Sequence, residues 1–140
     1  MGFTEDYIDA WNSHDEDRFV GQFAPDGAYC DAAVLVAYEG EAEIRRMFQQ
    51  SQDSYKNWKF VHQKGHSDER GYAVEWTYTA NWDGGEEYMT RGVSCGDFDA
   101  DGRIVENRDY WNPRTFPTKG EDHVAAERAA YEAREKRKKG

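Results

Sequence analysis

Cysteine is scarce in this 140-residue chain, which contains only Cys30 and Cys95. Neither lies in a Cys-x-x-Cys motif, and both fall in apolar segments, where a free cysteine behaves as a small hydrophobic residue. We therefore expect no disulfide framework and predict a reducing, cytoplasmic location. Long apolar runs are also missing, and the N-terminus becomes polar within a few residues, so we predict neither a signal peptide nor a membrane-spanning segment.

Motifs that hold metals or nucleotides are missing as well. The four histidines have no metal-ligand spacing, the sequence contains no P-loop, and we expect no nucleophile elbow to support a Ser or Cys triad. Asp97, Asp99 and Asp101 resemble the start of an EF-hand loop, but Arg108 stands where that loop requires a bidentate glutamate. An aspartate-rich hairpin turn is the better interpretation. We predict no metal ion and no cofactor.

Basic residues are few outside the C-terminal tail. The net charge is −10, and the segment from residue 119 onward holds seven Lys/Arg against five Asp/Glu. The rest of the chain is therefore strongly acidic and would repel phosphate backbones, so nucleic acid is not an expected partner. We predict one domain over residues 1–116, followed by a charged tail over 117–140 that is helical or disordered.

Apolar spacing predicts three helices in the first half of the chain. Thr4 is expected to cap the first, and Ser13 with Glu16 resembles a capping box for the second. The second helix is expected to continue to Phe23 and to end at the Pro-Asp-Gly turn of residues 25–27. The third helix follows Gly40, and its apolar stripe is formed by Ile44, Met47, Phe48, Ser51 and Tyr55.

Alternating apolar and polar residues then predict strands. The expected ranges are residues 28–33, 59–63, 72–82, 89–98 and 103–111. Helices followed by an antiparallel meander indicate an α+β fold, with the helices on one face of a curved sheet. Aromatic residues make up 15% of the chain, and large rings suit the walls of a hollow interior.

The last predicted strand carries the strongest functional signal. One face is expected to hold Val105, Asn107, Asp109 and Trp111, which mixes polar with apolar side chains. A carboxylate among apolar groups tends to have a raised pKa, which suits a general acid or base. We therefore predict that Asp109 is an acid/base residue. The alternative is a solvated edge strand with one exposed tryptophan.

Other polar residues lie on otherwise apolar elements. Tyr7 falls on the buried stripe of the first helix and Asp31 on the first strand. His62 follows Phe60 on the second strand and is a candidate catalytic residue that points into the interior. If the sheet curls around the helices, Tyr7, Asp31 and Asp109 are expected to converge with Asn107 on one cavity. The alternatives are ordinary core packing for Tyr7, a solvated strand-end carboxylate for Asp31, and a structural role for His62.

Several segments resemble a known family. Residues 7–15, 23–31 and 40–45 look like the start of the nuclear transport factor 2-like superfamily, and residues 74–78 and 102–111 resemble its SnoaL-like branch. The resemblance covers about residues 3–116. It implies a cone-shaped, curved antiparallel or mixed sheet packed on three N-terminal helices around a pocket, a cystatin-like α+β barrel that often forms a dimer.

The resemblance also implies roles for individual residues. Tyr7 and Asp31 match the enolate-binding tyrosine and the proton-transferring aspartate of ketosteroid isomerases, although Ser94 replaces the second oxyanion donor. Asp109 matches a catalytic aspartate of limonene epoxide hydrolases and of SnoaL-type polyketide cyclases. His62 resembles a strand histidine of scytalone dehydratases.

Departures from those relatives weaken any specific assignment. Trp76 and Tyr78 stand where epoxide hydrolases have their companion arginine and aspartate, which breaks that water-activating triad. Cys95 stands near the partner histidine of the polyketide cyclases. Epoxide hydrolysis therefore remains an alternative that requires a water bound between Asp109 and another polar group.

We predict a cofactor-independent acid/base enzyme, an isomerase, aldol-type cyclase or dehydratase, acting on a small hydrophobic carbonyl or polycyclic substrate. Asp109, oriented by Asn107, is the main acid/base, Asp31 is a second proton carrier, and Tyr7 donates to a developing oxyanion. A homodimer is expected. The rival is a non-catalytic ligand-binding or dimerising module of the same fold. Side chains expected to contact the substrate are Trp11, Trp76, Tyr78, Cys95 and Trp111.

Overall fold

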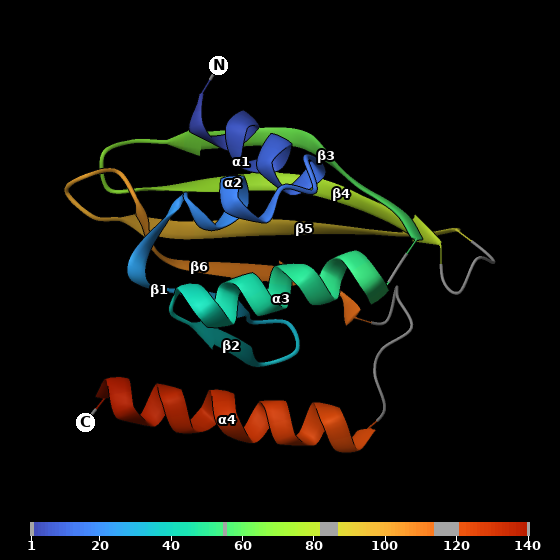
Figure 1. Ribbon diagram of the computed structural model, residues 1–140, viewed down its shortest axis with the longest axis vertical. Coiled ribbons are helices and arrows are strands. Elements are labelled where there is room, and N and C mark those ends of the chain that lie inside the picture. The colour runs from blue at the N-terminus through green and yellow to red at the C-terminus, as the bar shows by residue number, and fades with distance from the viewer. Residues whose placement is uncertain (1, 55, 82–86, 114–120, 140) are drawn as a thin grey trace.

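Six strands form one mixed sheet in the order β2-β1-β6-β5-β4-β3 (Figure 1). The computed structural model describes residues 2–54, 56–81, 87–113 and 121–139. In chain order the elements are α1 (Phe3–Asn12), α2 (Glu16–Val20), β1 (Phe23–Asp31), β2 (Val36–Glu39), α3 (Glu41–Ser54), β3 (Lys56–Ser67), β4 (Gly71–Asn81), β5 (Glu87–Phe98), β6 (Ile104–Trp111) and α4 (Glu121–Lys139).

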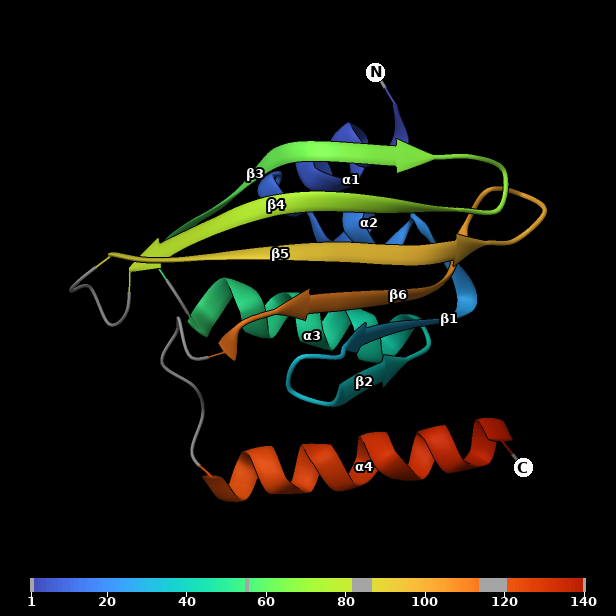
Figure 2. The ribbon, with the colours of Figure 1, turned by 180° about the vertical axis from the view of Figure 1, so that it is seen from behind.

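The helices α1, α2 and α3 lie on one face of the curved sheet, and the opposite face is seen from behind in Figure 2. This arrangement confirms the predicted α+β fold. All neighbouring strands are antiparallel except β1 and β6, which run parallel. The first and last of the described strands are therefore neighbours, and Asp31 lies level with Asp109.

The predicted caps of the first two helices are wrong. Gly2 is the N-cap of α1, because the helix already begins at Phe3, whose ring packs 4.8 Å from Tyr72 and 4.7 Å from Phe98 (centroid distances). Thr4 lies inside the helix and is buried. Asp15 caps α2, since its side chain accepts hydrogen bonds from two backbone N–H groups of the first turn.

The end predicted for the second helix is also wrong. Helix α2 ends at Val20, and Phe23 already belongs to β1. Strand β1 runs through the Pro-Asp-Gly segment as an irregularity, since Phe23 lies opposite Ile104 but the next aligned pair is Ala28 with Glu106. The Pro-Asp-Gly segment, which was interpreted from the sequence as a turn, therefore forms an irregularity within β1.

Strand β2 was not predicted from the sequence. It forms a hairpin with β1, and Leu35 in the connection adopts a φ of 60°. Tight turns with positive φ are usually marked by Gly or Asn, so an apolar turn residue gave no signal.

A bulge in β6 changes which residues face inward. Phe98 lies opposite Ile104 and Asp97 opposite Glu106, so Val105 is an extra residue. Ile104 is consequently buried, whereas Val105 is 43% exposed. The predicted inner face is wrong at Val105 and correct at Asn107 and Asp109, which are both buried.

Aromatic rings fill the space between the helices and the sheet. Trp11 on α1 is the centre of this packing, with ring centroids 4.4 Å from Phe19, 5.3 Å from Phe48 and 5.1 Å from Phe60. Aromatic pairs at such distances contribute stability beyond the area they bury. The interior below α1 is therefore a packed core.

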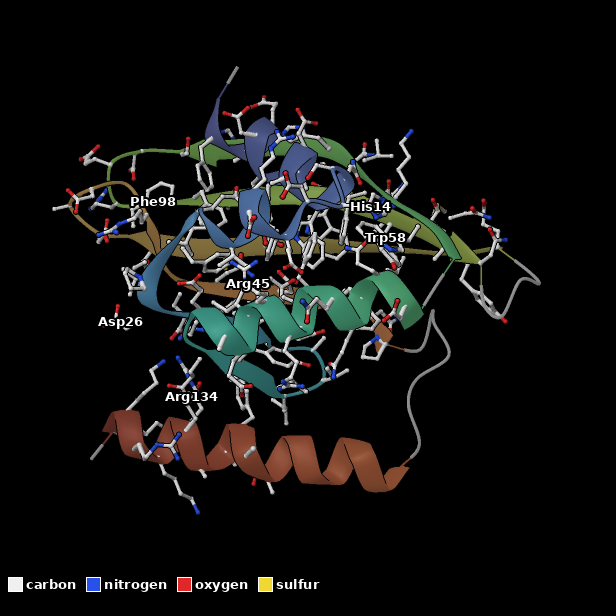
Figure 3. All side chains as sticks on the ribbon, viewed as in Figure 1. His14, Asp26, Arg45, Trp58, Phe98 and Arg134 are labelled. Atoms are coloured by element: carbon white, nitrogen blue, oxygen red, sulfur yellow. The ribbon has the colours of Figure 1, made fainter. Side chains whose placement is uncertain are left out.

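Helix α4 falls within the segment predicted to be a charged helical or disordered tail, and it lies alongside β2 (Figures 1 and 2). Arg134 extends from α4 toward the sheet (Figure 3). It pairs with Glu106 at 2.6 Å and Glu39 at 3.1 Å, and Lys138 approaches Glu106 to 3.4 Å. Ion pairs thus connect α4 to β2 and β6. Within the described ranges, no helix combines the length and apolar character needed to span a membrane.

Candidate functional site

The candidate site is built by residues that lie level with one another on adjacent strands. Because β4, β5, β6 and β1 are neighbours in the sheet, positions in register form rows across it. The three rows are Val74–Ser94–Asp109–Asp31, Tyr72–Gly96–Asn107–Tyr29 and Trp76–Gly92–Trp111.

Asp109 is enclosed by hydrogen-bond donors. Its Oδ1 accepts from Ser94 Oγ at 2.5 Å and from Asn107 Nδ2 at 2.9 Å, and its Oδ2 accepts from the Tyr29 hydroxyl. Burial raises the pKa of Asp109, and these three hydrogen bonds oppose that shift. Both oxygens of this carboxylate are therefore already occupied by protein donors.

Asn107 links Asp109 to two tyrosines. Its Oδ1 accepts from the Tyr7 hydroxyl at 3.2 Å and from the Tyr72 hydroxyl at 2.5 Å, and the side chain is fully buried. Burial raises the pKa of both phenols well above the ordinary value, so they remain protonated donors at neutral pH. The structure thus places the hydroxyl of Tyr7, the predicted oxyanion donor, against an amide oxygen.

Two glycines on β5 allow aromatic side chains of β4 to reach across this strand. A Cβ at Gly92 would lie 2.3 Å from the Trp76 ring, and one at Gly96 would lie 2.7 Å from the Tyr72 hydroxyl oxygen. Trp76 uses this space to donate from Nε1 to Ser94 Oγ at 2.9 Å. The Gly-x-Ser-x-Gly alternation over residues 92–96 could have indicated this crossing, but it was not used in the prediction from the sequence. These letters match a nucleophile elbow, but they lie inside strand β5 and not at the strand-to-helix turn that an elbow requires.

Asp31 has a different environment from Asp109. It is partly exposed, and its Oδ1 accepts from Trp111 Nε1 at 2.8 Å. Burial and repulsion from Asp109 raise the pKa of Asp31 to about 7, against the lowering effect of Trp111 and of backbone N–H groups. Asp31 therefore changes its charge near neutral pH.

Stability is expected to fall as the pH rises from about 4 to about 7. In this window the unfolded chain has already released the proton of Asp31, whereas the folded protein still holds it. Each increase in pH therefore lowers the free energy of unfolding. Asp31→Asn keeps an acceptor for Trp111 and should flatten this dependence. Urea unfolding at a series of pH values measures it. Asp9→Asn, at an exposed position on α1, is the control, and equal slopes in both variants would contradict the prediction.

The remaining predicted site residues have other surroundings. His62 Nε2 lies 3.1 Å from Thr4 Oγ1 and 3.9 Å from a Glu5 oxygen, so it faces α1. Tyr78 is half-buried, with its ring 4.7 Å from that of Phe60. Cys95 follows the inward-facing Ser94 and therefore lies on the outer face of β5.

Trp11 and Trp76, which were predicted to contact a substrate, are only 5% and 4% exposed. Trp111 is partly exposed and holds Asp31. Two surface hollows, one beside the β3–β4 turn and one between α2, β1 and α3, are both lined by residues other than Asp31 and Asp109. Asp31 and Trp111 are therefore the most accessible members of the candidate site.

Three residues that support the acidic pair, two of them directly and one through Asn107, were not chosen as site residues from the sequence. Tyr29 and Ser94 donate to Asp109, and Tyr72 donates to Asn107. Within the described residues, no group of three or more His, Cys, Asp or Glu side chains is placed to hold a metal ion. The chemistry that this arrangement supports is proton transfer by carboxyl groups in a mostly buried, aromatic environment.

Comparison with known proteins matches the chain to one family. A family model described as the SnoaL-like domain covers residues 4–107, from α1 to Asn107 on β6. No curated protein matches the chain.

Solved structures with the same fold include three informative examples. A Catenulispora acidiphila protein with a ketosteroid isomerase-like fold, in complex with trimethylamine, has a TM-score of 0.73 at 17% identity, covering 80% of this chain and 86% of that one. A Shewanella denitrificans protein described by its likeness to SnoaL-like polyketide cyclases has a TM-score of 0.70 at 18% identity, with 80% and 89% covered. The Mycobacterium tuberculosis protein RV0760c, in complex with estradiol-17beta-hemisuccinate, has a TM-score of 0.66 at 17% identity, with 82% and 95% covered.

Proposed function

Because this chain belongs to the SnoaL-like domain family, we propose that it is a cofactor-independent acid/base enzyme acting on a small hydrophobic carbonyl compound. The observation that supports this function is that Asp31 and Asp109 lie opposite each other on β1 and β6 but have different environments. Asp109 is enclosed by three donors, whereas Asp31 is partly exposed and has a pKa of about 7. Such unequal pairs are a recurrent arrangement in enzymes that move protons near neutral pH.

The proposed roles of the two aspartates differ from those expected from the sequence, since Asp31 and not Asp109 is the main acid/base. Ionised Asp31 removes a proton from the carbon next to the substrate carbonyl, which leaves an enolate. The resulting carboxylic acid returns that proton to a different carbon in an isomerisation, or to a departing hydroxyl group in a dehydration. Asp109 does not exchange protons in this scheme, and its negative charge acts together with the burial of Asp31 to keep the pKa of Asp31 near 7.

Access and surroundings favour a small apolar substrate. Trp111 and Val34 are partly exposed apolar residues near Asp31, and both pack against the aromatic core. Two proteins with the same fold hold small organic molecules, trimethylamine in one and an estradiol ester in the other. Those ligands support the proposal that this chain binds a small organic molecule.

A homodimer is part of the same proposal. Val93 and Tyr110 lie directly opposite each other on β5 and β6 and are 38% and 50% exposed. Contact between two copies of this chain would remove these apolar side chains from water. Sedimentation of the wild-type chain and of a Tyr110→Glu variant tests this, since only the wild type should sediment as a dimer.

Proton exchange measured by NMR tests the catalytic function. The chain is incubated in deuterated buffer with a panel of cyclic ketones, and deuterium incorporation next to the carbonyl is followed over time. Exchange faster than in buffer, increasing as the pH rises through about 7, is the expected result. Ketones that bind with no accelerated exchange would instead support the non-catalytic binding module. If none of the ketones binds and none shows accelerated deuterium incorporation, the proposed substrate class is contradicted.

A further inference from the structure

Tyr72 connects a strand distant from Asp109 to the hydrogen bonds around that carboxylate. We propose that Tyr72 is a positioning residue: its hydroxyl, reaching across β5 at Gly96, holds the amide of Asn107 with its N–H groups toward Asp109. This inference deepens the proposed function and depends on it for its catalytic meaning. Tyr72 acts through Asn107 and is not itself expected to touch the substrate.

The strand register makes this contact specific. Tyr72, Gly96 and Asn107 lie level on β4, β5 and β6, so the tyrosine must cross one whole strand to reach the amide. A Cβ at Gly96 would occupy the space of the hydroxyl, at 2.7 Å from its oxygen and 2.8 Å from Cε1. Glycine at this position is therefore what lets a tyrosine hydroxyl reach a residue two strands away.

The two tyrosines determine the orientation of the amide. Tyr7 and Tyr72 both donate to Oδ1 of Asn107, at 3.2 and 2.5 Å, which leaves Nδ2 to donate to Asp109 at 2.9 Å. The opposite orientation would place the amide oxygen against the carboxylate, where two acceptors repel each other. Hydrogen bonds in such a chain polarise one another, so the Tyr72 hydroxyl strengthens the bond that reaches Asp109.

Other groups around Asp109 act on it directly. Tyr29 and Asp31 approach from β1, and Ser94 approaches from β5. Asn107 is the neighbour on its own strand. Tyr72 is different, because its hydroxyl donates to the amide of Asn107, although Tyr72 and Asp109 are also close enough to interact electrostatically. A change limited to its hydroxyl therefore isolates the positioning effect from the direct hydrogen bonds.

The test is a carboxyl titration of the full chain labelled with ¹³C-aspartate, comparing the wild type with Tyr72→Phe. This variant retains the ring that packs 5.5 Å from Tyr7 and 4.8 Å from Phe3. Loss of the hydroxyl should raise the pKa of Asp109 by about 0.1–0.7 unit, because one hydrogen bond in a chain strengthens the next by about 10–30%. Tyr7→Phe removes the longer of the two bonds and should give a smaller shift in the same direction.

Tyr110→Phe on the outer face is the matched control and should leave the Asp109 titration unchanged. An unchanged pKa of Asp109 in Tyr72→Phe, even with reduced stability, would show that the hydroxyl has only a structural role and would overturn the inference. The titration needs no substrate. Its failure is therefore distinct from the failure of the exchange assay, which would contradict the proposed function alone.

Discussion

Replacing Asp109 with leucine is expected to lower the free energy of unfolding by about 3–5 kcal/mol. The change leaves the donor groups of Tyr29, Ser94 and Asn107 buried without an acceptor. Each unpaired buried donor costs about 1–3 kcal/mol, and some of that cost is recovered because a buried charge is also removed. Urea unfolding at pH 7, with signals from both tryptophan fluorescence and circular dichroism, measures the loss.

Asp109→Asn is the matched variant for this prediction. Its amide oxygen still accepts from Ser94 and Asn107, and its amide nitrogen faces the hydroxyl oxygen of Tyr29. A loss of less than about 2 kcal/mol is expected, because the pairing is largely preserved. If the leucine variant were as stable as the asparagine variant, the three hydrogen bonds would not hold the site together.

Replacing Asp31 with asparagine is expected to lower turnover by about 10²–10⁴-fold, the usual contribution of one positioned acid/base. The amide oxygen still accepts from Trp111, so the fold should be retained. Above pH 7 the variant should also be more stable than the wild type, because it lacks the charge that Asp109 repels. The rate of deuterium exchange at pH 8, with the ketone that the wild type processes fastest, measures the effect.

Loss of activity combined with gain of stability excludes unfolding as the cause. Asp9→Asn, which removes an exposed carboxylate from α1, should change neither quantity. If Asp31→Asn retained the wild-type exchange rate while Asp109→Asn lost it, the proton carrier would be Asp109 and the roles proposed for the two aspartates would be reversed.

Local sequence patterns predicted most of the helices and strands, but not the pairing that unites them. Hydrophobic periodicity gave α3 and the strands β4, β5 and β6 within a few residues. The hairpin partner β2 was missed because Leu35 occupies a turn position that usually carries Gly or Asn. The parallel pairing of β1 with β6 joins residues nearly 80 positions apart, as the Tyr29 and Trp111 hydrogen bonds show, and no local pattern reports such a contact.

The candidate site was predictable only in part for the same reason. Asn107 and Asp109 were identifiable because polar side chains interrupted an apolar face. Tyr29 and Tyr72 gave no such signal, since tyrosine is a common strand residue whose hydroxyl partner depends on register. The bulge at Val105 reversed one assignment of side-chain direction, because a single inserted residue shifts the alternation.

The central position of β6 has a consequence for how the chain folds. Among the described residues it is the last strand in the sequence, yet it lies between β1 and β5 in the sheet. Until Ile104–Trp111 has left the ribosome, β1 and β5 each have an unpaired edge that can attract other chains. Folding of the sheet must therefore wait for the end of synthesis of this domain, and premature termination before residue 104 would yield an aggregating fragment rather than a smaller, weaker version of the protein.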